Sequence, residues 1–303
     1  MVAVWRNYSS DELASTHIER LHALRMLRDG IALGPTFTFD LEQHRADGNV
    51  RYEAITHQVL DALAELEVKG TFFVVADVAS TTPSLIRRIA QDGHEIASHD
   101  LVHVSWESRT PKGLREDLRR ARGELEDLVG LAVRGVRAPF FSLTARTPWA
   151  PEVLSEVGFE YSSSVLPAVN PISGFPGVPR HPFRWPTGLV EFPVPLHGRG
   201  RLSLPLLGGF YLRFAAMRSI RSVLAEPRGQ ALWTYVHAYD LDPDEPRSPV
   251  HGSGRFLTLL LALGRHRTWP RLAAIHGGDV SADPFAQRLD QGEFTNTPLS
   301  PSL

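Results

Sequence analysis

The sequence predicts an α/β fold in which a parallel sheet closes into a barrel. Seven strand-like apolar runs alternate with segments whose apolar residues recur at helical spacing, and this alternation is typical of parallel sheets joined by crossover helices. Glycine and proline mark most boundaries between the two kinds of segment. Several runs end on a polar or charged residue, which is where such barrels place their active sites. A closed barrel is the simplest arrangement for this many parallel strands.

The strand-like runs are rich in β-branched and aromatic residues. The first of them reads IALGPTFTFDL and the second reads TFFVV. Five further runs follow. In chain order, the expected strands cover residues 31–41, 71–75, 94–98, 133–141, 159–165, 189–194 and 231–237.

The helical segments carry conventional start and stop signals. Ile55, Val59 and Leu63 form the apolar stripe of one helix. Three of the later helices open with proline and close at glycine, because proline is favoured in the first helical turn and glycine just past the last. In chain order, the expected helices cover residues 9–28, 55–66, 83–93, 111–130, 148–157, 210–224 and 256–263.

Most of the chain is expected to form one domain. The alternation gives a barrel over residues 31–279, preceded by a helical extension over residues 1–30. A proline- and glycine-rich excursion over residues 166–188 is too long for a simple connector and is expected to shape a rim or pocket. Residues 280–303 are polar and contain prolines, so we expect a flexible tail there.

The composition is that of a globular protein without a broad charge field. The 303 residues are 43% hydrophobic and carry a net charge of −2, which argues against an electrostatic grip on nucleic acid or anionic membrane. The N-terminus lacks a signal segment, and no run approaches the roughly 18 apolar residues of a membrane span. We therefore expect a cytoplasmic protein. Because the chain has no cysteine, any metal site must use imidazole and carboxylate ligands.

Two histidines, His99 and His103, follow the third strand-like run with three residues between them. If the chain makes a helical turn there, both imidazoles lie on one face and can bind a single cation. Other ionisable residues fall in the neighbouring runs: Asp40 near the end of the first, Arg137 in the fourth and His237 at the end of the last. Because the carboxyl ends of parallel strands meet at one end of a barrel, these side chains are expected to converge.

Five motifs, in this order, resemble the polysaccharide deacetylases with a NodB-type domain. They are TFDLE (38–42), GTFFV (70–74), GHEIASHDLVH (93–103), RAP (137–139) and HAYDLDP (237–243). The resemblance spans about residues 33–245. It implies a distorted (β/α) barrel that binds one divalent metal and removes acetyl groups from N-acetylated sugars. Zinc is the metal it favours, and cobalt, nickel, manganese and iron are the alternatives.

Carried over residue by residue, the resemblance implies a catalytic group of four residues. Asp40 matches the catalytic base, and Arg137 matches the arginine that pairs with the base and orients it. His237 matches the general acid. The backbone N–H of Phe140, just beyond the RAP motif, is the candidate donor to an oxyanion.

The resemblance also implies that Glu42, His99 and His103 hold the metal. In many relatives the metal-binding carboxylate directly follows the base, whereas here that position is Leu41 and the carboxylate comes one residue later. Relatives with an Asp-x-Asp arrangement exist, which makes Glu42 the expected third ligand. Asp40 is the alternative carboxylate ligand.

A second departure from the relatives lies in the fifth strand-like run. Relatives often have Tyr-Asp-Ser-Ser there, whereas this chain has Tyr-Ser-Ser-Ser over residues 161–164, so a carboxylate that can tune the catalytic groups is missing. The substrate is expected to contact Pro139, Tyr161, Trp185 and Tyr239. For Tyr161 and Trp185, a place in the core or rim is the alternative.

Together these residue types are a complete set for amide hydrolysis: metal ligands, a base, an orienting arginine and an acid. Each has a structural alternative, since Asp40 can cap a loop, Glu42 can be solvated, Arg137 can form a plain salt bridge and the histidines can be hydrogen-bonded core residues. We expect a hydrolase that removes an N-acetyl group from a sugar or sugar conjugate. The alternatives are hydrolysis of a non-sugar amide or cyclic imide, and an inactive carbohydrate-binding homologue.

Overall fold

The computed structural model describes residues 34–44, 51–170, 173–198, 200, 203–225, 231–245, 261–277 and 283–292. The predicted N-terminal extension lies outside these residues, as does most of the helix expected over residues 256–263.

Eight strands form one sheet in the order β6-β7-β5-β4-β3-β2-β1-β8. Every neighbouring pair is parallel except the antiparallel pair of β6 and β7 at one edge. Because β6 and β8 are the two edges, the sheet curls without closing, so the closed barrel expected from the strand alternation is wrong. The distorted (β/α) barrel implied by the family resemblance is confirmed. The strands are β1 (Thr36–Leu41), β2 (Gly70–Val74), β3 (Glu95–Ser98), β4 (Gly135–Val136), β5 (Tyr161–Ser162), β6 (Phe183–Arg184), β7 (Val190–Glu191) and β8 (Trp233–His237).

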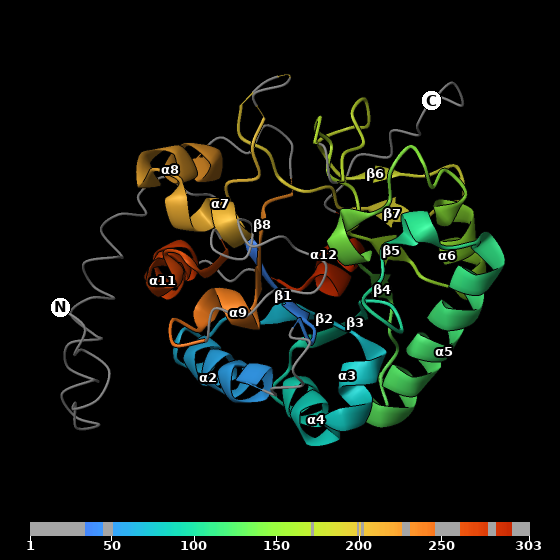
Figure 1. The fold of residues 1–303 in the computed structure, drawn as a ribbon, viewed down its shortest axis with the longest axis horizontal. Coiled ribbons are helices and arrows are strands. Elements are labelled where there is room, and N and C mark those ends of the chain that lie inside the picture. Colours follow the sequence, from blue (N-terminus) through green and yellow to red (C-terminus); the bar gives the residue numbers. More distant parts are fainter. Residues whose placement is uncertain are drawn as a thin grey trace.

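Helices surround this sheet, and in Figure 1 the helices α2, α4, α3 and α5 form an arc along it. The helices that were predicted to begin at or near prolines and end before glycine are confirmed to within a few residues. The described helices are α2 (Arg51–Glu65), α3 (Ala76–Thr81), α4 (Pro83–Gln91), α5 (Pro111–Val129), α6 (Ala150–Val157), α7 (Gly209–Phe214), α8 (Met217–Ala225), α9 (Ala238–Leu241), α11 (Thr268–His276) and α12 (Phe285–Gln291). None of them is long and apolar enough to cross a membrane.

The period-two alternation of the strands separates two buried layers. In β1 the side chains of Phe37, Phe39 and Leu41 belong to the large core between the sheet and the helices. Thr38 and Asp40 alternate with them and therefore face the interior of the curled sheet. The same alternation in the other strands fills the interior with a second core, which includes Phe73, Tyr161, Phe192 and Trp233.

The fourth and fifth strands are shorter than the sequence predicts. The run 133–141 pairs only at Gly135–Val136, and its end forms a short 3-10 turn over Pro139–Phe141. Proline cannot donate to a strand ladder, and both Phe140 and Phe141 have positive φ, at 58° and 52°. The chain therefore leaves the sheet early and turns over its carboxyl end. The helix expected over 210–224 is likewise divided, into α7 and α8.

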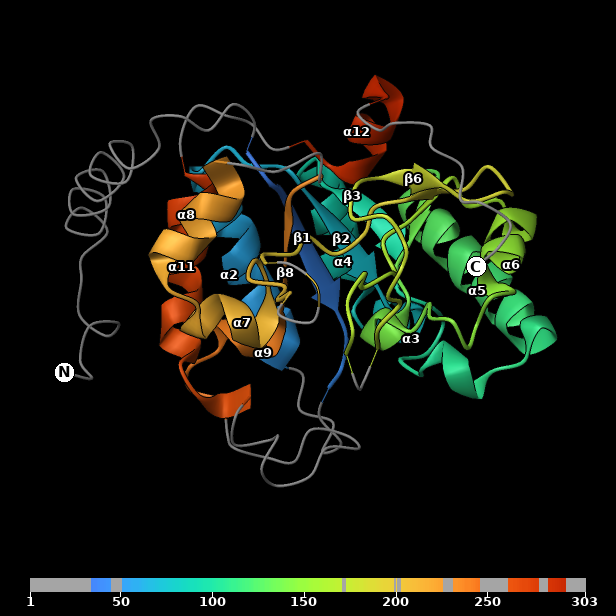
Figure 2. The same cartoon turned by 90° about the horizontal axis from the view of Figure 1, so that it is seen from above.

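The predicted flexible tail contains an ordered anchor, which corrects that expectation for residues 285–291. Phe285, the first residue of α12, is fully buried and stacks on Phe192 with ring centroids 4.6 Å apart. Its backbone N–H donates to Thr71 Oγ1 at 3.0 Å, at the start of β2. Figure 2 shows α12 at the end of the sheet where β1 begins. Phe285 is one of only two aromatic residues in the polar tail, which is too little periodicity to be recognised from sequence, yet it packs against this end of the sheet.

Replacing Phe285 with alanine is expected to lower the free energy of unfolding by about 3–5 kcal/mol, because it empties a fully buried site among aromatic rings. Urea unfolding followed by circular dichroism measures this. Phe214→Ala is the matched control, since Phe214 is 43% exposed. A loss for Phe285→Ala no larger than that of the control would show that α12 does not hold the barrel together.

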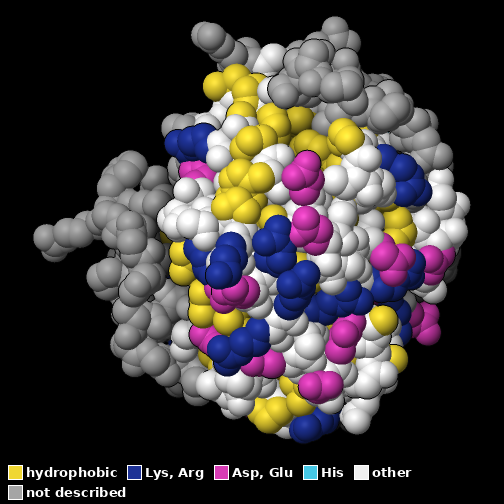
Figure 3. All heavy atoms as spheres, turned by 90° about the vertical axis from the view of Figure 1, so that its right-hand side faces the viewer, with side chains coloured by type: hydrophobic (Ala, Val, Ile, Leu, Met, Phe, Trp, Pro, Cys, Tyr) yellow, Lys and Arg dark blue, Asp and Glu magenta, His cyan; other side chains and the backbone are white. Residues whose placement is uncertain are grey.

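The face that carries α5 is charged but of mixed sign. Lysine and arginine side chains intermix with aspartate and glutamate over this face (Figure 3). Within α5, Arg120 pairs with Glu124 and Arg122 with Glu126, each one helical turn apart. Exposed pairs of this kind contribute little to stability, and their opposite signs leave no uniform field.

Candidate metal centre and active site

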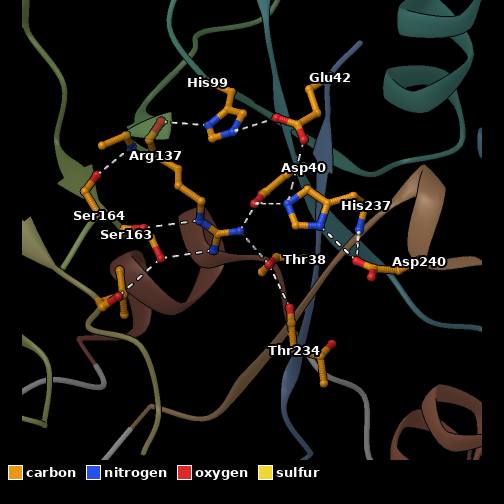
Figure 4. A network of polar contacts seen from close by, with 12 residues as sticks. Thr38, Asp40, Glu42, His99, Arg137, Ser163, Ser164, Thr234, His237 and Asp240 are labelled. Atoms are coloured by element: carbon orange, nitrogen blue, oxygen red, sulfur yellow. Dashed lines mark hydrogen bonds and ion pairs between the residues drawn. The ribbon is translucent and has the colours of Figure 1, made fainter. Parts of the chain in front are cut away.

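Polar side chains from four strands meet at the carboxyl end of the sheet (Figure 4). Asp40 lies in β1 beside His237 of the neighbouring strand β8, and the two residues are register partners. His99 follows β3 directly, and Arg137 follows β4. Because these strands are adjacent and parallel, their ends bring residues nearly 200 positions apart into contact, and the predicted convergence is found.

Glu42, His99 and His103 form a compact group. One ligand atom from each lies within 4.8 Å of the others. Glu42 Oε2 is 3.9 Å from His99 Nε2 and in direct contact with His103 Nε2. Glu42 and His99 are buried, and His103 is partly exposed. Apart from this contact with His103, the same buried Glu42 oxygen has no hydrogen-bond partner in the described part of the chain.

A tight turn, and not the helical turn that was considered, brings the two imidazoles together. Asp100 has a φ of 73°, a conformation that aspartate tolerates better than most residues. Its carboxylate accepts hydrogen bonds from the Leu101 backbone N–H and the Trp106 indole N–H, both at 2.7 Å. The ring centroids of His99 and His103 are then 5.1 Å apart.

The orientation of His99 leaves one nitrogen free for a ligand. Its Nδ1 lies 2.8 Å from the carbonyl oxygen of Arg137, so this nitrogen donates the hydrogen bond. Nε2 is then unprotonated in the neutral ring and faces Glu42. Burial lowers the pKa of His99 to about 4, which keeps the ring neutral at physiological pH.

The charge of Glu42 is set by its surroundings. Burial alone would raise the pKa of this carboxyl, but the neighbouring His103, His237 and His99 hold it well below its usual range. A buried carboxylate beside two imidazoles is a donor set that fits a divalent cation. The hydrogen bond from His99 to a backbone carbonyl is the kind of outer contact that orients metal-binding histidines.

Asp40 is held by a buried arginine. Arg137 is fully buried, and its Nη1 donates to Asp40 Oδ1 at 2.6 Å and to Thr38 Oγ1 at 2.9 Å. Its Nε donates to the Ser163 carbonyl at 3.2 Å and its Nη2 to the Ser163 hydroxyl at 3.1 Å. One oxygen of Asp40 is therefore committed to Arg137, while Oδ2 faces His237 Nε2 at 3.7 Å.

His237 lies on the other side of Asp40 and has its own carboxylate partner. Its Nδ1 is 2.9 Å from Asp240 Oδ2, and Nε2 points toward Asp40 and Glu42. Asp240 is in turn paired with Arg213 at 2.9 Å, and neither is accessible to solvent. Burial would lower the pKa of His237, but its hydrogen bond to Asp240 and the nearby carboxylates raise the pKa to about 9. His237 is therefore protonated at neutral pH in the metal-free protein.

The sequence reasoning missed Asp240 and Arg213. Asp240 follows His237 by three residues in the motif HAYDLDP, and a histidine and a carboxylate at this spacing at the start of a short helix can form a capping pair, so a signal existed. Arg213 gave no local signal, because its contact with Asp240 joins α7 to α9.

The backbone N–H of Phe140, the candidate oxyanion donor, lies in a turn next to His103. Among the described residues, the Phe140 N–H has no acceptor, and its φ of 58° lies in the left-handed region. The Phe140 side chain is 49% exposed and lies against the His103 ring, with centroids 4.4 Å apart. Pro139 is buried beneath this turn, and Tyr239 stacks on His237 at 4.7 Å. Both predicted substrate contacts thus adjoin the site.

Two other predicted substrate contacts are wrong. Tyr161 is fully buried, and its hydroxyl donates to Glu95 at 2.8 Å, near the amino end of the sheet. Trp185 is buried against Phe183, and its indole N–H donates to Glu191 at 3.3 Å. Both residues take the core alternative. Tyr161, at the start of its strand, points into the closed end of the barrel, whereas Trp185 follows β6 and packs in the core between the sheet and the helices.

The comparisons with known proteins divide the chain in two. Residues 36–162 match the family model described as polysaccharide deacetylase. Residues 163–285 match a model described only as a domain of unknown function, DUF3473. The second segment supplies β6, β7 and β8 of the same sheet, together with His237. The two segments therefore build one barrel.

Curated relatives match about a third of the chain. A stretch of 90 residues, 28% of this chain, is 38% identical to the chitooligosaccharide deacetylase of Sinorhizobium fredii and covers 40% of that protein. A stretch of 98 residues, 32% of this chain, is 31% identical to the peptidoglycan-N-acetylglucosamine deacetylase of Bacillus cereus and covers 36% of it. The chain thus matches less than half the length of these relatives.

A solved structure shows the same fold over nearly the whole chain. It is the crystal structure of a candidate polysaccharide deacetylase from Mycobacterium smegmatis, with a TM-score of 0.59 and 24% sequence identity. The similarity covers 91% of this chain and 96% of that one. The curled sheet and its helices are therefore a known arrangement.

Proposed function

Because residues 36–162 belong to the polysaccharide deacetylase family, we propose that this protein is a metal-dependent hydrolase that removes an N-acetyl group from an N-acetylated sugar or sugar conjugate. The observation that carries the proposal is the position of the group Glu42, His99 and His103 directly beside Asp40 and His237. The names of the relatives from Sinorhizobium fredii and Bacillus cereus supply the substrate class.

The proposed cofactor is one divalent metal, zinc before cobalt, nickel, manganese or iron. Glu42, His99 and His103 would hold it, since two imidazoles and one carboxylate are a common ligand set for catalytic zinc. A divalent cation there supplies Lewis acidity toward the substrate carbonyl and toward water.

The protein groups around that position divide the proton transfers between them. Asp40, hydrogen-bonded to Arg137, takes the proton from the water that attacks the carbonyl carbon. The Phe140 N–H donates to the oxygen on which charge develops. His237 gives its proton to the amide nitrogen as the C–N bond breaks, so that acetate and a free amine leave. Asp240 keeps the ring of His237 oriented during this step.

Acetate release tests the proposal. The protein is freed of metal, reloaded with one divalent metal at a time, and incubated with chitooligosaccharides and with peptidoglycan fragments. We expect acetate and free amine in equal amounts, dependent on the added metal. Hydrolysis of cyclic imides or ureides without acetate release from any acetamido sugar would contradict the proposed substrate class, and sugar binding without turnover would contradict hydrolysis altogether.

A further inference from the structure

Glu191, in β7, is a buried carboxylate without a charged partner. It is inaccessible to solvent, and among the residues that the structure describes no lysine, arginine or histidine forms an ion pair with it. Its acceptor oxygens instead receive the Ser164 N–H at 2.7 Å, the Val165 N–H at 3.0 Å and the Trp185 indole N–H at 3.3 Å. Burial raises the pKa of Glu191. Burying a carboxyl group without a charged partner costs free energy, which suggests a role for Glu191 other than packing.

The backbone that Glu191 holds is the segment that follows β5. Two serines of this segment accept hydrogen bonds from the residues that follow β4. Arg137 donates to Ser163 twice, from Nε to the carbonyl oxygen and from Nη2 to the hydroxyl, and the Ala138 N–H donates to Ser164 Oγ at 2.8 Å. Figure 4 shows Ser163 and Ser164 on the side of Arg137 opposite Asp40. The segment after β4 is therefore held by hydrogen bonds to the segment after β5, and Glu191 in turn holds the segment after β5.

We propose that Glu191 is a positioning residue for the deacetylation: by accepting the backbone N–H groups of Ser164 and Val165, it fixes the segment that holds Arg137 and the backbone that leads to Phe140. This inference rests on the proposed function. Glu191 lies within residues 163–285, the segment that matches the domain of unknown function. The proposal therefore assigns this segment a second role in the reaction, in addition to supplying His237.

The effect of this anchor falls on the chemical step. Arg137 orients Asp40, and the Phe140 N–H is the proposed donor to the oxyanion, so both act when the water attacks and charge develops. None of the contacts of Glu191 is with the open site. Loss of Glu191 should therefore lower kcat and leave KM nearly unchanged.

The register of β5 and β7 allows the carboxylate of Glu191 to be transferred to position 162 by a double substitution. Ser162 is the partner of Glu191 on the adjacent strand, and its hydroxyl donates to Ser164 Oγ at 2.8 Å. An aspartate at position 162 can accept the N–H of the residue two positions later, which is Ser164, as aspartates do in Asx-turns. The double variant Ser162→Asp with Glu191→Ser thus returns an acceptor to the same backbone from the opposite strand.

The test compares these variants in the metal-loaded protein. Glu191→Ala is expected to lose about 10²-fold in kcat, the scale of a catalytic group misplaced by about 1 Å, with KM within about twofold. Glu191→Gln, which keeps one acceptor oxygen, should lose less. The double variant should recover kcat to within about tenfold of the wild type. The matched control is Glu95→Gln, which changes a partly buried carboxyl that accepts hydrogen bonds from residues of β2, β5 and α12 and should reduce stability without changing kcat.

Amide hydrogen exchange gives a readout that does not depend on turnover. In Glu191→Ala, the amides of Ala138 and Ser164 should exchange faster than in the wild type and in Glu95→Gln. A wild-type kcat in Glu191→Ala would overturn the proposal, as would a double variant that regains thermal stability without regaining kcat. If the wild-type protein releases no acetate, the proposed function fails, while unchanged exchange at Ala138 and Ser164 would separately overturn the anchor.

Discussion

Replacing Asp40 with asparagine is expected to leave the metal bound and to remove most of the turnover. Asparagine keeps an oxygen that can accept the hydrogen bond from Arg137, so the local structure should survive. It cannot take a proton from water, and a positioned base contributes on the order of 10²–10⁴ in rate. We expect kcat to fall by that factor while the metal content, measured by mass spectrometry of the purified protein, stays at the wild-type level.

The control for this variant is Asp127→Asn, which changes an exposed carboxylate on α5. It should behave as the wild type in both measurements. An Asp40→Asn protein with wild-type kcat would show that another group accepts the proton. A variant that loses its metal would instead identify Asp40 as the carboxylate ligand.

Replacing Glu42 with glutamine is expected to weaken metal binding strongly. The change removes the only carboxylate in the group of three and leaves two imidazoles. Altering an outer partner of a metal ligand typically costs 10–100-fold in affinity, so loss of a charged ligand should cost at least as much. Titration with a competing chelator measures the affinity. Turnover should return in part at high metal concentration, because Asp40 and His237 remain in place.

His103→Ala extends this comparison. Because His103 contacts Glu42 directly, its removal should abolish both metal binding and turnover. His44→Ala is the matched control, since His44 is bonded to Glu245 and does not belong to the group of three. Equal metal affinity in the wild type and in Glu42→Gln would exclude Glu42 as a ligand.

The parts of the site that could be predicted from sequence are those encoded by strand alternation. The run TFTFDLE places Asp40 and Glu42 on the face opposite Phe39 and Leu41, and strand ends on a parallel sheet meet at one edge. This local rule, with the order of the motifs, was enough to bring Asp40, His99, Arg137 and His237 together before any coordinates were known.

The parts that could not be predicted depend on contacts between distant segments. Arg213 reaches Asp240 across two helices, and Glu191 reaches Ser164 across two strands, and neither contact leaves a local pattern. The prediction that Tyr161 contacts the substrate was wrong for a related reason. Its position on the inner face is predictable, but whether an inward residue lies at the mouth or in the closed end depends on the length of its strand, which is short here.

The claim on which this account rests is that one divalent cation lies between Glu42, His99 and His103. Crystals of the zinc-loaded protein, measured on both sides of the zinc absorption edge, test it directly. We expect one anomalous peak about 2.0–2.1 Å from the Nε2 atoms of His99 and His103 and from a Glu42 oxygen, with Asp40 outside this shell. A peak coordinated by Asp40 and His237, or two imidazoles turned away from the peak, would contradict the account.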